Sequence, residues 1–304
     1  MTAEIAIPTG GIRLRRFRDR VVETFLLAAA LVAVFTTIAI VLVLVFESLP
    51  FFSHVSLVDF LTDTMWTPLF AEARYGIMPL VAGTLVTTFV ALAVAIPAGT
   101  IIAIYLSEFA PFKLRETIKP ALELLGAVPT VVYGYFALMV VTPMLQKLIP
   151  GLPGFNMLSA GLVIGIMIIP YVASVSEDAM RAVPNYMREG SYAMGATRFQ
   201  TATRVVVPGA LSGIAAAYIL GISRAVGETM VVAIAAGLQP NLTWDPTEPA
   251  ATITAFIVQV SLGDLPHDSI GYQSIFAAGL VLMVMTLMFN IAGFALTRRF
   301  RQAY

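Results

Sequence analysis

Hydrophobic residues fill six long stretches of this chain, and shorter polar segments between them carry most of the charges. The six stretches run over Thr24–Phe46, Ile77–Tyr105, Leu122–Leu145, Met157–Val175, Pro208–Leu238 and Gln273–Leu296. Each reaches or approaches the ~20 residues that a helix needs to cross the hydrocarbon core of a bilayer. The pattern predicts an all-α membrane protein with six transmembrane helices.

Composition agrees with a membrane protein and excludes an ordinary soluble domain. Hydrophobic residues make up 59% of the chain and charged residues 12%, with a mean hydropathy of +0.88. Soluble domains average about 45–50% apolar residues. The net charge of zero does not favour nucleic-acid binding, and the absence of cysteine excludes disulfides and thiolate metal sites.

The positions of the basic residues predict the orientation. Segments before the first stretch, after the second and fourth, and after the last are rich in Lys and Arg, whereas the opposite segments contain only Arg74 and Lys147. Because basic residues remain on the cytoplasmic side, we expect both termini in the cytoplasm. Residues 1–23 then form a cytoplasmic basic arm. The first stretch is too long for a signal-peptide core and is expected to remain as an anchor.

The chain carries few groups suited to catalysis. Its two histidines, His54 and His267, fall in predicted outer loops without companions that could complete a metal site. No G-x-x-x-x-G-K-[ST] phosphate loop occurs, so if ATP hydrolysis drives this protein, another chain performs it. We therefore expect no cofactor on this chain and no enzymatic activity of its own.

Residues 176–208 form a predicted cytoplasmic loop with its own short helices. Ser176, Glu177 and Asp178 can cap a helix start, Gly195 can turn the chain, and Pro208 marks the entry to the fifth span. The product is two short helices joined at Gly195. Such a helix can dock in a groove on a partner, or it can lie against its own membrane domain.

This loop resembles the EAA loop of ABC importer permeases, with the pattern E-A-A, three residues, G, nine residues, I-x-L-P. The matching residues are Glu189-Gly190-Ser191, Gly195 and Val205-Val206-Val207-Pro208. Gly190 and Ser191 replace the alanines, and valines replace Ile and Leu. The resemblance implies the type I permease fold over residues 24–304. It also implies that Glu189, Gly195 and Pro208 belong to a coupling loop that contacts an ATPase.

Four further segments are similar to the PstC type of phosphate-specific permease. They are Ser107–Pro111, Pro129–Gly134, Ser176–Ala179 and Arg224–Met230. The resemblance implies a heterodimer with a PstA-like permease, a PstB-like ATPase dimer that uses ATP and Mg, and an external PstS-like phosphate-binding protein. It places this assembly in a prokaryotic plasma (inner) membrane. Met230 favours PstC over PstA, whose motif usually continues with Ala-Pro.

Arg224 and Glu228 are ionisable residues inside an apolar stretch, and such residues usually face a pore, a cavity or a partner. At positions i and i+4 they are expected to share a helical face, although Arg before Glu is the less favourable order for a local ion pair. Arg suits phosphate oxygens, and Glu would orient or neutralise it. A structural ion pair is the alternative.

Three function classes follow from these observations. The first is a permease subunit of an ATP-driven importer for phosphate, or for another oxyanion such as sulfate or molybdate, which one Arg would suit similarly. The second is a secondary transporter with Glu228 as a proton-coupling acid. The third is a nontransporting scaffold or a membrane enzyme, and the lack of a nucleophile, metal site or paired carboxylates at matching depth disfavours the enzyme.

Overall fold

The computed structural model describes residues 9–299 except 69, 71, 264, 267 and 268, so His267 lies outside the described residues. Among these residues, five helical segments are long and apolar enough to cross a membrane, and a bent pair makes a sixth if it is counted as one span. The segments are Arg16–His54, Met78–Phe109, Thr130–Leu148, Met157–Arg181, Ile270–Ala295 and the pair Arg198–Gly209 with Leu211–Val226. The predicted all-α membrane fold is confirmed.

The helices follow one another with short connections, and three π-helical segments (η) interrupt them. In chain order they are α1 (Thr9–His54), α2 (Leu57–Thr62), α3 (Met78–Ile104), η1 (Tyr105–Phe109), α4 (Phe112–Ala127), α5 (Thr130–Phe136), η2 (Ala137–Val141), α6 (Thr142–Leu148), α7 (Met157–Arg181), α8 (Asn185–Ala193), α9 (Arg198–Thr201), η3 (Ala202–Val206), α10 (Val207–Gly209), α11 (Leu211–Val226), α12 (Met230–Ala235), α13 (Ile253–Ser261) and α14 (Ile270–Arg299).

Helix α7 forms the centre of the bundle, packed between α3 and α11. Glycines allow the close approach of α3 and α7. A Cβ atom added at Gly161 would lie 2.7 Å from Val90 Cβ, and one added at Gly165 would lie 2.7 Å from the Ala91 carbonyl oxygen. Small residues at such contacts let membrane helices gain van der Waals packing, since no hydrophobic effect drives their association in lipid.

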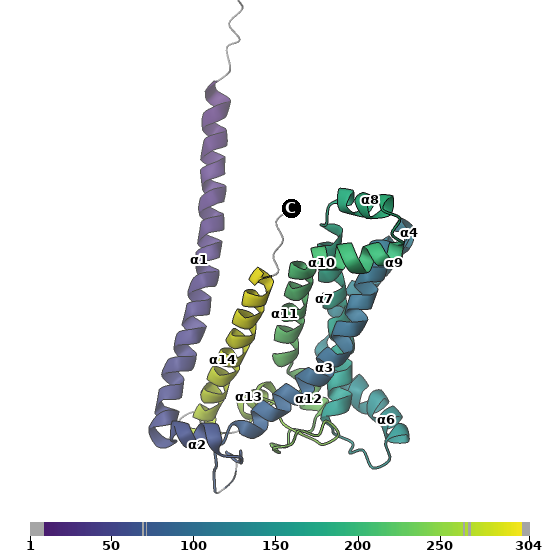
Figure 1. Ribbon diagram of the computed structural model, residues 1–304. Helices are drawn as coiled ribbons and strands as arrows, with labels where there is room; N and C mark the ends of the chain where they lie inside the picture. The colour runs from purple at the N-terminus through teal and green to yellow at the C-terminus, as the bar shows by residue number, and fades with distance from the viewer. Residues whose placement is uncertain (1–8, 69, 71, 264, 267–268, 300–304) are drawn as a thin grey trace, which may run out of the picture.

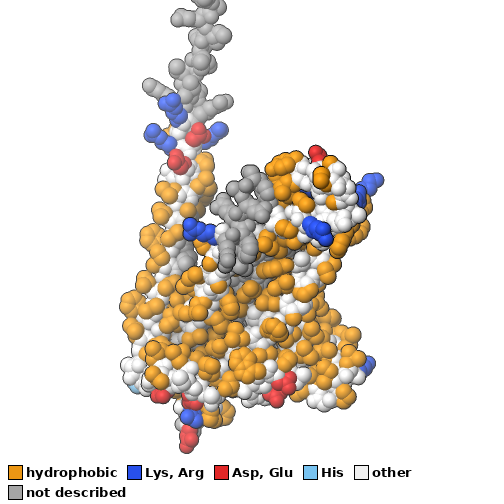
Figure 2. Space-filling model, viewed as in Figure 1, with side chains coloured by type: hydrophobic (Ala, Val, Ile, Leu, Met, Phe, Trp, Pro, Cys, Tyr) orange, Lys and Arg blue, Asp and Glu red, His pale blue; other side chains and the backbone are white. Residues whose placement is uncertain are grey.

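Helix α1 stands at the edge of the bundle beside α14, and most of its apolar side chains are exposed (Figure 1). Figure 2 shows that hydrophobic side chains cover the visible face, while charged side chains gather mainly toward its two ends. The beginning of α1, the end of α14 and the short helices α8 and α9 lie on the same side of the bundle. Residues 9–23 form the first turns of α1. The domain boundary at residue 23 stays a prediction.

Two of the predicted spans have different limits in the structure. The third was expected to begin at Leu122, but α4 ends at Ala127 and the span runs over 130–148. Pro129 disfavours the helical conformation at the preceding residue, and Val128 is extended with φ −66° and ψ 131°. The fifth was expected to be one helix over 208–238, which is wrong. The chain bends by 72° near Ala210, and α11 ends at Val226.

Candidate functional site

The loop between α7 and α11 contains the two short helices that the sequence predicts. Gly195 joins α8 to α9 with φ +81°, in the left-handed region that suits glycine. Thr197 then caps α9 in a reciprocal capping box, accepting from the Gln200 backbone N–H at 3.3 Å and donating its own N–H to Gln200 Oε1 at 2.9 Å. The predicted turn at Gly195 is confirmed.

The predicted helix start at Ser176 is wrong. Ser176, Glu177 and Asp178 lie in the last two turns of α7, which continues to Arg181. The chain leaves the helix just before Pro184, whose ring disfavours helical geometry at the residue before it. The acidic side chains bind basic residues of α4 instead of capping a helix.

Several side chains of the α8–α9 loop are exposed to solvent. Glu189 is exposed, and its side chain forms no hydrogen bond or ion pair within the described part of the chain. Tyr186 and Met194 expose 63% and 89% of their surface, so the same loop also presents apolar side chains. Pro208 lies in α10, directly before the 72° bend that leads into α11.

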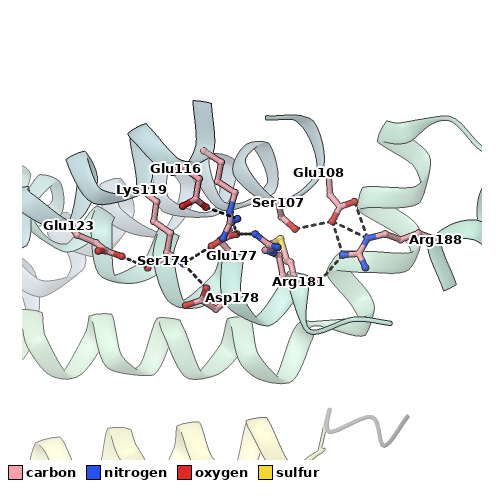
Figure 3. Close-up of polar contacts among 12 residues, drawn as sticks. Ser107, Glu108, Glu116, Lys119, Glu123, Ser174, Glu177, Asp178, Arg181 and Arg188 are labelled. Carbon is pink, nitrogen blue, oxygen red and sulfur yellow. Dashed lines mark hydrogen bonds and ion pairs between the residues drawn. The ribbon is translucent and has the colours of Figure 1, made fainter. Parts of the chain in front are cut away.

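An ion pair fastens α8 to the membrane helices (Figure 3). Arg188 Nη2 donates to Glu108 Oε1 at 2.9 Å, and the same guanidinium donates to the carbonyl oxygens of Val183 at 2.6 Å and Met180 at 2.8 Å. Glu108 lies in η1 at the end of the second span, so this clamp joins α8 to the ends of both α3 and α7. Sequence reasoning missed Arg188. A carboxylate at the end of an apolar span and a loop arginine were the available signals.

A second charged cluster joins α4 to α7 beside the clamp. The Glu177 carboxylate is fully buried and accepts from Arg115 Nε at 2.8 Å and Lys119 Nζ at 2.7 Å. Burial by itself would lower the pKa of Lys119, but hydrogen bonds and charge from Asp178 and Glu177 outweigh it and raise the pKa. Two cations on one buried carboxylate hold α4 in place, because an uncompensated buried charge is costly.

Arg224 lies in the last turn of α11 and is partly buried. Its guanidinium carbon lies 4.6 Å from the centre of the Tyr171 ring on α7, within the range of a cation–π interaction. Its Nε atom is buried and has no hydrogen-bond partner among the described residues. The guanidinium therefore packs against an aromatic ring and, within the described residues, keeps one buried donor unused.

Glu228 is buried in the break between α11 and α12. Its Oε1 accepts weakly from the Val231 backbone N–H at 3.4 Å, and its carbonyl oxygen accepts from Thr254 Oγ1 at 2.7 Å. The expectation that Arg224 and Glu228 share a helical face is wrong, because Gly227 ends α11 with φ −87° and ψ 0°. No ion pair joins them in the described structure.

The helix break gives each of the two charges a separate environment. Arg224 sits at the carboxyl end of α11, where unpaired carbonyl groups favour a cation, and Glu228 precedes the amino end of α12, where amide groups favour an anion. The backbone groups of these helix ends thus favour the charge of Arg224 and that of Glu228 without an ion pair between the two side chains. Within the described residues, the buried Arg224 Nε donor is left without a hydrogen-bond partner beside this break.

Comparison with known proteins identifies the chain's relatives. Residues 95–302 match the model of the family described as "Binding-protein-dependent transport system inner membrane component". A probable ABC transporter permease protein of Bacillus subtilis, YqgH, is 34% identical over 279 residues, which cover 91% of this chain and 89% of that protein. The phosphate transport system permease protein PstC of Mesorhizobium japonicum is 32% identical over 321 residues, covering 94% of this chain and 95% of the relative.

Solved structures show the same fold. A chain of a bacterial alginate ABC transporter, in complex with its periplasmic protein, superposes with a TM-score of 0.65 at 18% identity and covers 93% of this chain and 95% of that one. A chain of the MetNI methionine ABC transporter in an inward-facing conformation gives 0.54 at 19% identity, covering 74% and 94%. The expected fold of an ABC importer permease is confirmed.

Proposed function

This chain belongs to the family of binding-protein-dependent transport system inner membrane components, and from that premise we propose that it is the permease subunit of an ATP-driven importer of inorganic phosphate. The observation that carries the proposal is the similarity, over more than nine-tenths of both chains, to a permease named for phosphate transport. The permease domain spans residues 24–304, following a basic arm over residues 1–23. It lies in a prokaryotic plasma membrane with both termini in the cytoplasm.

The importer requires further chains. A PstA-like permease completes the pathway, a PstB-like ATPase dimer binds ATP and Mg, and a PstS-like protein delivers phosphate from outside. The sequence lacks a phosphate loop of its own, which supports a separate ATPase. The exposed face of α8, with Glu189, Tyr186 and Met194, supports a contact with that ATPase.

Coupling runs from α8 into the membrane through the Arg188–Glu108 clamp. When the ATPase closes, it displaces α8 and the turn at Gly195. Because Arg188 bonds to η1 and to the end of α7, the displacement reaches α3 and α7 rather than being absorbed in the loop. Helix α7 carries Tyr171, whose ring lies against Arg224. Movement of α8 is thereby linked to the guanidinium in the pathway.

Arg224 is the phosphate contact within the pathway. Its guanidinium offers charged, paired donors that match phosphate oxygens, and Tyr171 orients it. Its buried Nε, which has no partner among the described residues, supports this role. Glu228 lies at the same break and acts as a gate, since its negative charge disfavours a long stay of phosphate beside Arg224.

Uptake by the reconstituted importer tests the proposal. The complete complex in proteoliposomes, supplied with its binding protein and internal ATP, should accumulate labelled phosphate and not labelled sulfate. The Arg224→Gln variant should assemble and lose most uptake. The assignment to phosphate fails if sulfate is imported in its place, and the role of Arg224 fails if Arg224→Gln transports at the parent rate.

A further inference from the structure

A polar pocket of about 430 Å³ opens where the clamp and the α4–α7 cluster meet. Three arginines from three helices line it: Arg115 of α4, Arg181 at the end of α7 and Arg188 of α8. Asn185 adds an amide, and Ser107 adds a hydroxyl that donates to Glu108 Oε1 at 2.8 Å. Figure 3 shows Arg181 between the Glu177 cluster and the Glu108–Arg188 pair. The pocket is separate from the break at Arg224.

The pocket exposes its cations and covers its carboxylates. The Arg181 side chain is 47% exposed and those of Arg115 and Arg188 are each 15% exposed, whereas Glu108 is 6% exposed and Glu177 is fully buried. Both oxygens of Glu108 already face Arg188. The surface that a ligand meets is therefore positive, although the carboxylates behind it balance much of the charge.

Arg181 is the least satisfied of these cations. Its Nη1 lies 3.8 Å from Glu177 Oε1, beyond hydrogen-bond distance, and the Glu177 oxygens already accept from Arg115 and Lys119 at 2.8 and 2.7 Å. By contrast, Arg188 has the Glu108 carboxylate and two backbone carbonyls as acceptors. Arg181 thus presents a charged fork to the pocket with its donors still available.

Two helices also begin at the pocket wall. Phe112 is the first residue of α4 and Asn185 the first of α8, and both line the pocket. Proline precedes each helix, and no acidic residue occupies its first turn. Among the described residues, no side chain caps the amide groups of either helix. The amide groups of these first turns add positive potential to that of the arginines.

We propose that this pocket binds a phosphate group, with Arg181 as its main contact. The group comes either from inorganic phosphate in the cytoplasm or from the headgroup of an anionic phospholipid, since the pocket lies at the end of the second span. A bound phosphate group bridges α4, α7 and α8 and stiffens the attachment of α8. The pocket's cytoplasmic location rests on the proposed orientation of the importer, whereas its binding chemistry does not.

Equilibrium binding to the assembled permease and ATPase complex tests the site. The complex carries Arg224→Gln, which removes the pathway contact, and is placed in nanodiscs of phosphatidylcholine without the external binding protein. Radiolabelled inorganic phosphate should bind saturably. Arg181→Gln should weaken binding by about tenfold or more, as expected for loss of a charge-assisted hydrogen bond. Arg204→Gln, which changes an exposed arginine outside the pocket, should have no effect.

A second arm distinguishes the two sources. If the group belongs to a lipid, free phosphate does not bind in phosphatidylcholine, and native mass spectrometry of complexes from phosphatidylglycerol nanodiscs shows a retained lipid that Arg181→Gln removes. Arg181→Lys keeps the charge and should give intermediate affinity, which also supplies a test if Arg181→Gln does not assemble. The proposal is overturned if the substitutions at Arg181 change neither the binding of inorganic phosphate nor the retention of the lipid. Sulfate uptake in place of phosphate would refute the proposed function and leave this site standing.

Discussion

The clamp between Arg188 and Glu108 gives the sharpest prediction. Replacing Arg188 with Gln leaves a nearly buried carboxylate and two backbone carbonyls without their charged donor. Charge-assisted hydrogen bonds contribute about 1.5–3 kcal/mol each, and truncating one partner of a buried pair costs about 3–5 kcal/mol. We expect Arg188→Gln to lower the free energy of unfolding of the permease pair by roughly 3 kcal/mol. This value is the lower end of the range for a buried pair, because the guanidinium is partly exposed to solvent.

A double-mutant cycle measures the pair directly. Denaturant unfolding in detergent is compared for Arg188→Gln, Glu108→Gln and the double variant. The double variant should be less destabilised than the sum of the single variants by about 1.5–3 kcal/mol. In proteoliposomes, Arg188→Gln should reduce the phosphate imported per ATP hydrolysed while the ATPase still co-purifies. Arg204→Gln is the matched control. Additive destabilisation, together with an unchanged phosphate-to-ATP ratio, would refute the clamp as a coupling element.

Four further changes have defined outcomes. Gly195→Val strains a left-handed residue by about 1–3 kcal/mol and should reduce ATPase co-purification and uptake, and normal values of both would exclude a coupling role for the turn. Tyr171→Leu removes the ring beneath Arg224 and should raise the phosphate concentration for half-maximal uptake roughly two- to thirtyfold, and an unchanged value contradicts the pathway assignment. Glu228→Gln should leave ATP hydrolysis partly active but poorly coupled to uptake, and normal coupling removes Glu228 as a gate. The pKa of Lys119 is higher in the folded protein than its ordinary value of 10.5, so its charge stabilises the fold fully below pH 10.5 and this stabilisation is lost as the pH rises through the folded-state pKa. Lys119→Met should therefore reduce the fall in the free energy of unfolding at alkaline pH.

Sequence patterns were sufficient to predict those features that depend on a few neighbouring residues. Apolar stretches long enough to cross a bilayer predicted the spanning helices, because the need to satisfy backbone groups in lipid leaves few other structures. The turn at Gly195 was predictable for the same kind of reason, since a left-handed residue after a short helix strongly favours glycine. The family resemblance was carried by motif spacing, which is also a local property.

Helix ends were harder to predict inside apolar sequence. The stretch over 208–238 is mostly apolar, so hydrophobicity alone did not show that the chain bends near Ala210 and that α11 ends at Val226. Arg224 and Glu228 stood out as ionisable residues within an apolar stretch, but the assumed i, i+4 geometry required a continuous helix. The break separates them and gives Arg224 the face of Tyr171 in place of a carboxylate.

The sequence by itself determined the class of protein, the approximate spans and the residues that merit attention, because hydrophobicity, charge and turn preference act over a few neighbouring residues. Only the tertiary structure decided which charges meet. Glu108 and Arg188 are 80 residues apart, and Arg115 and Glu177 are 62 apart. Such pairs form because the packing of α3, α4, α7 and α8 brings distant segments together, and no local pattern records that packing.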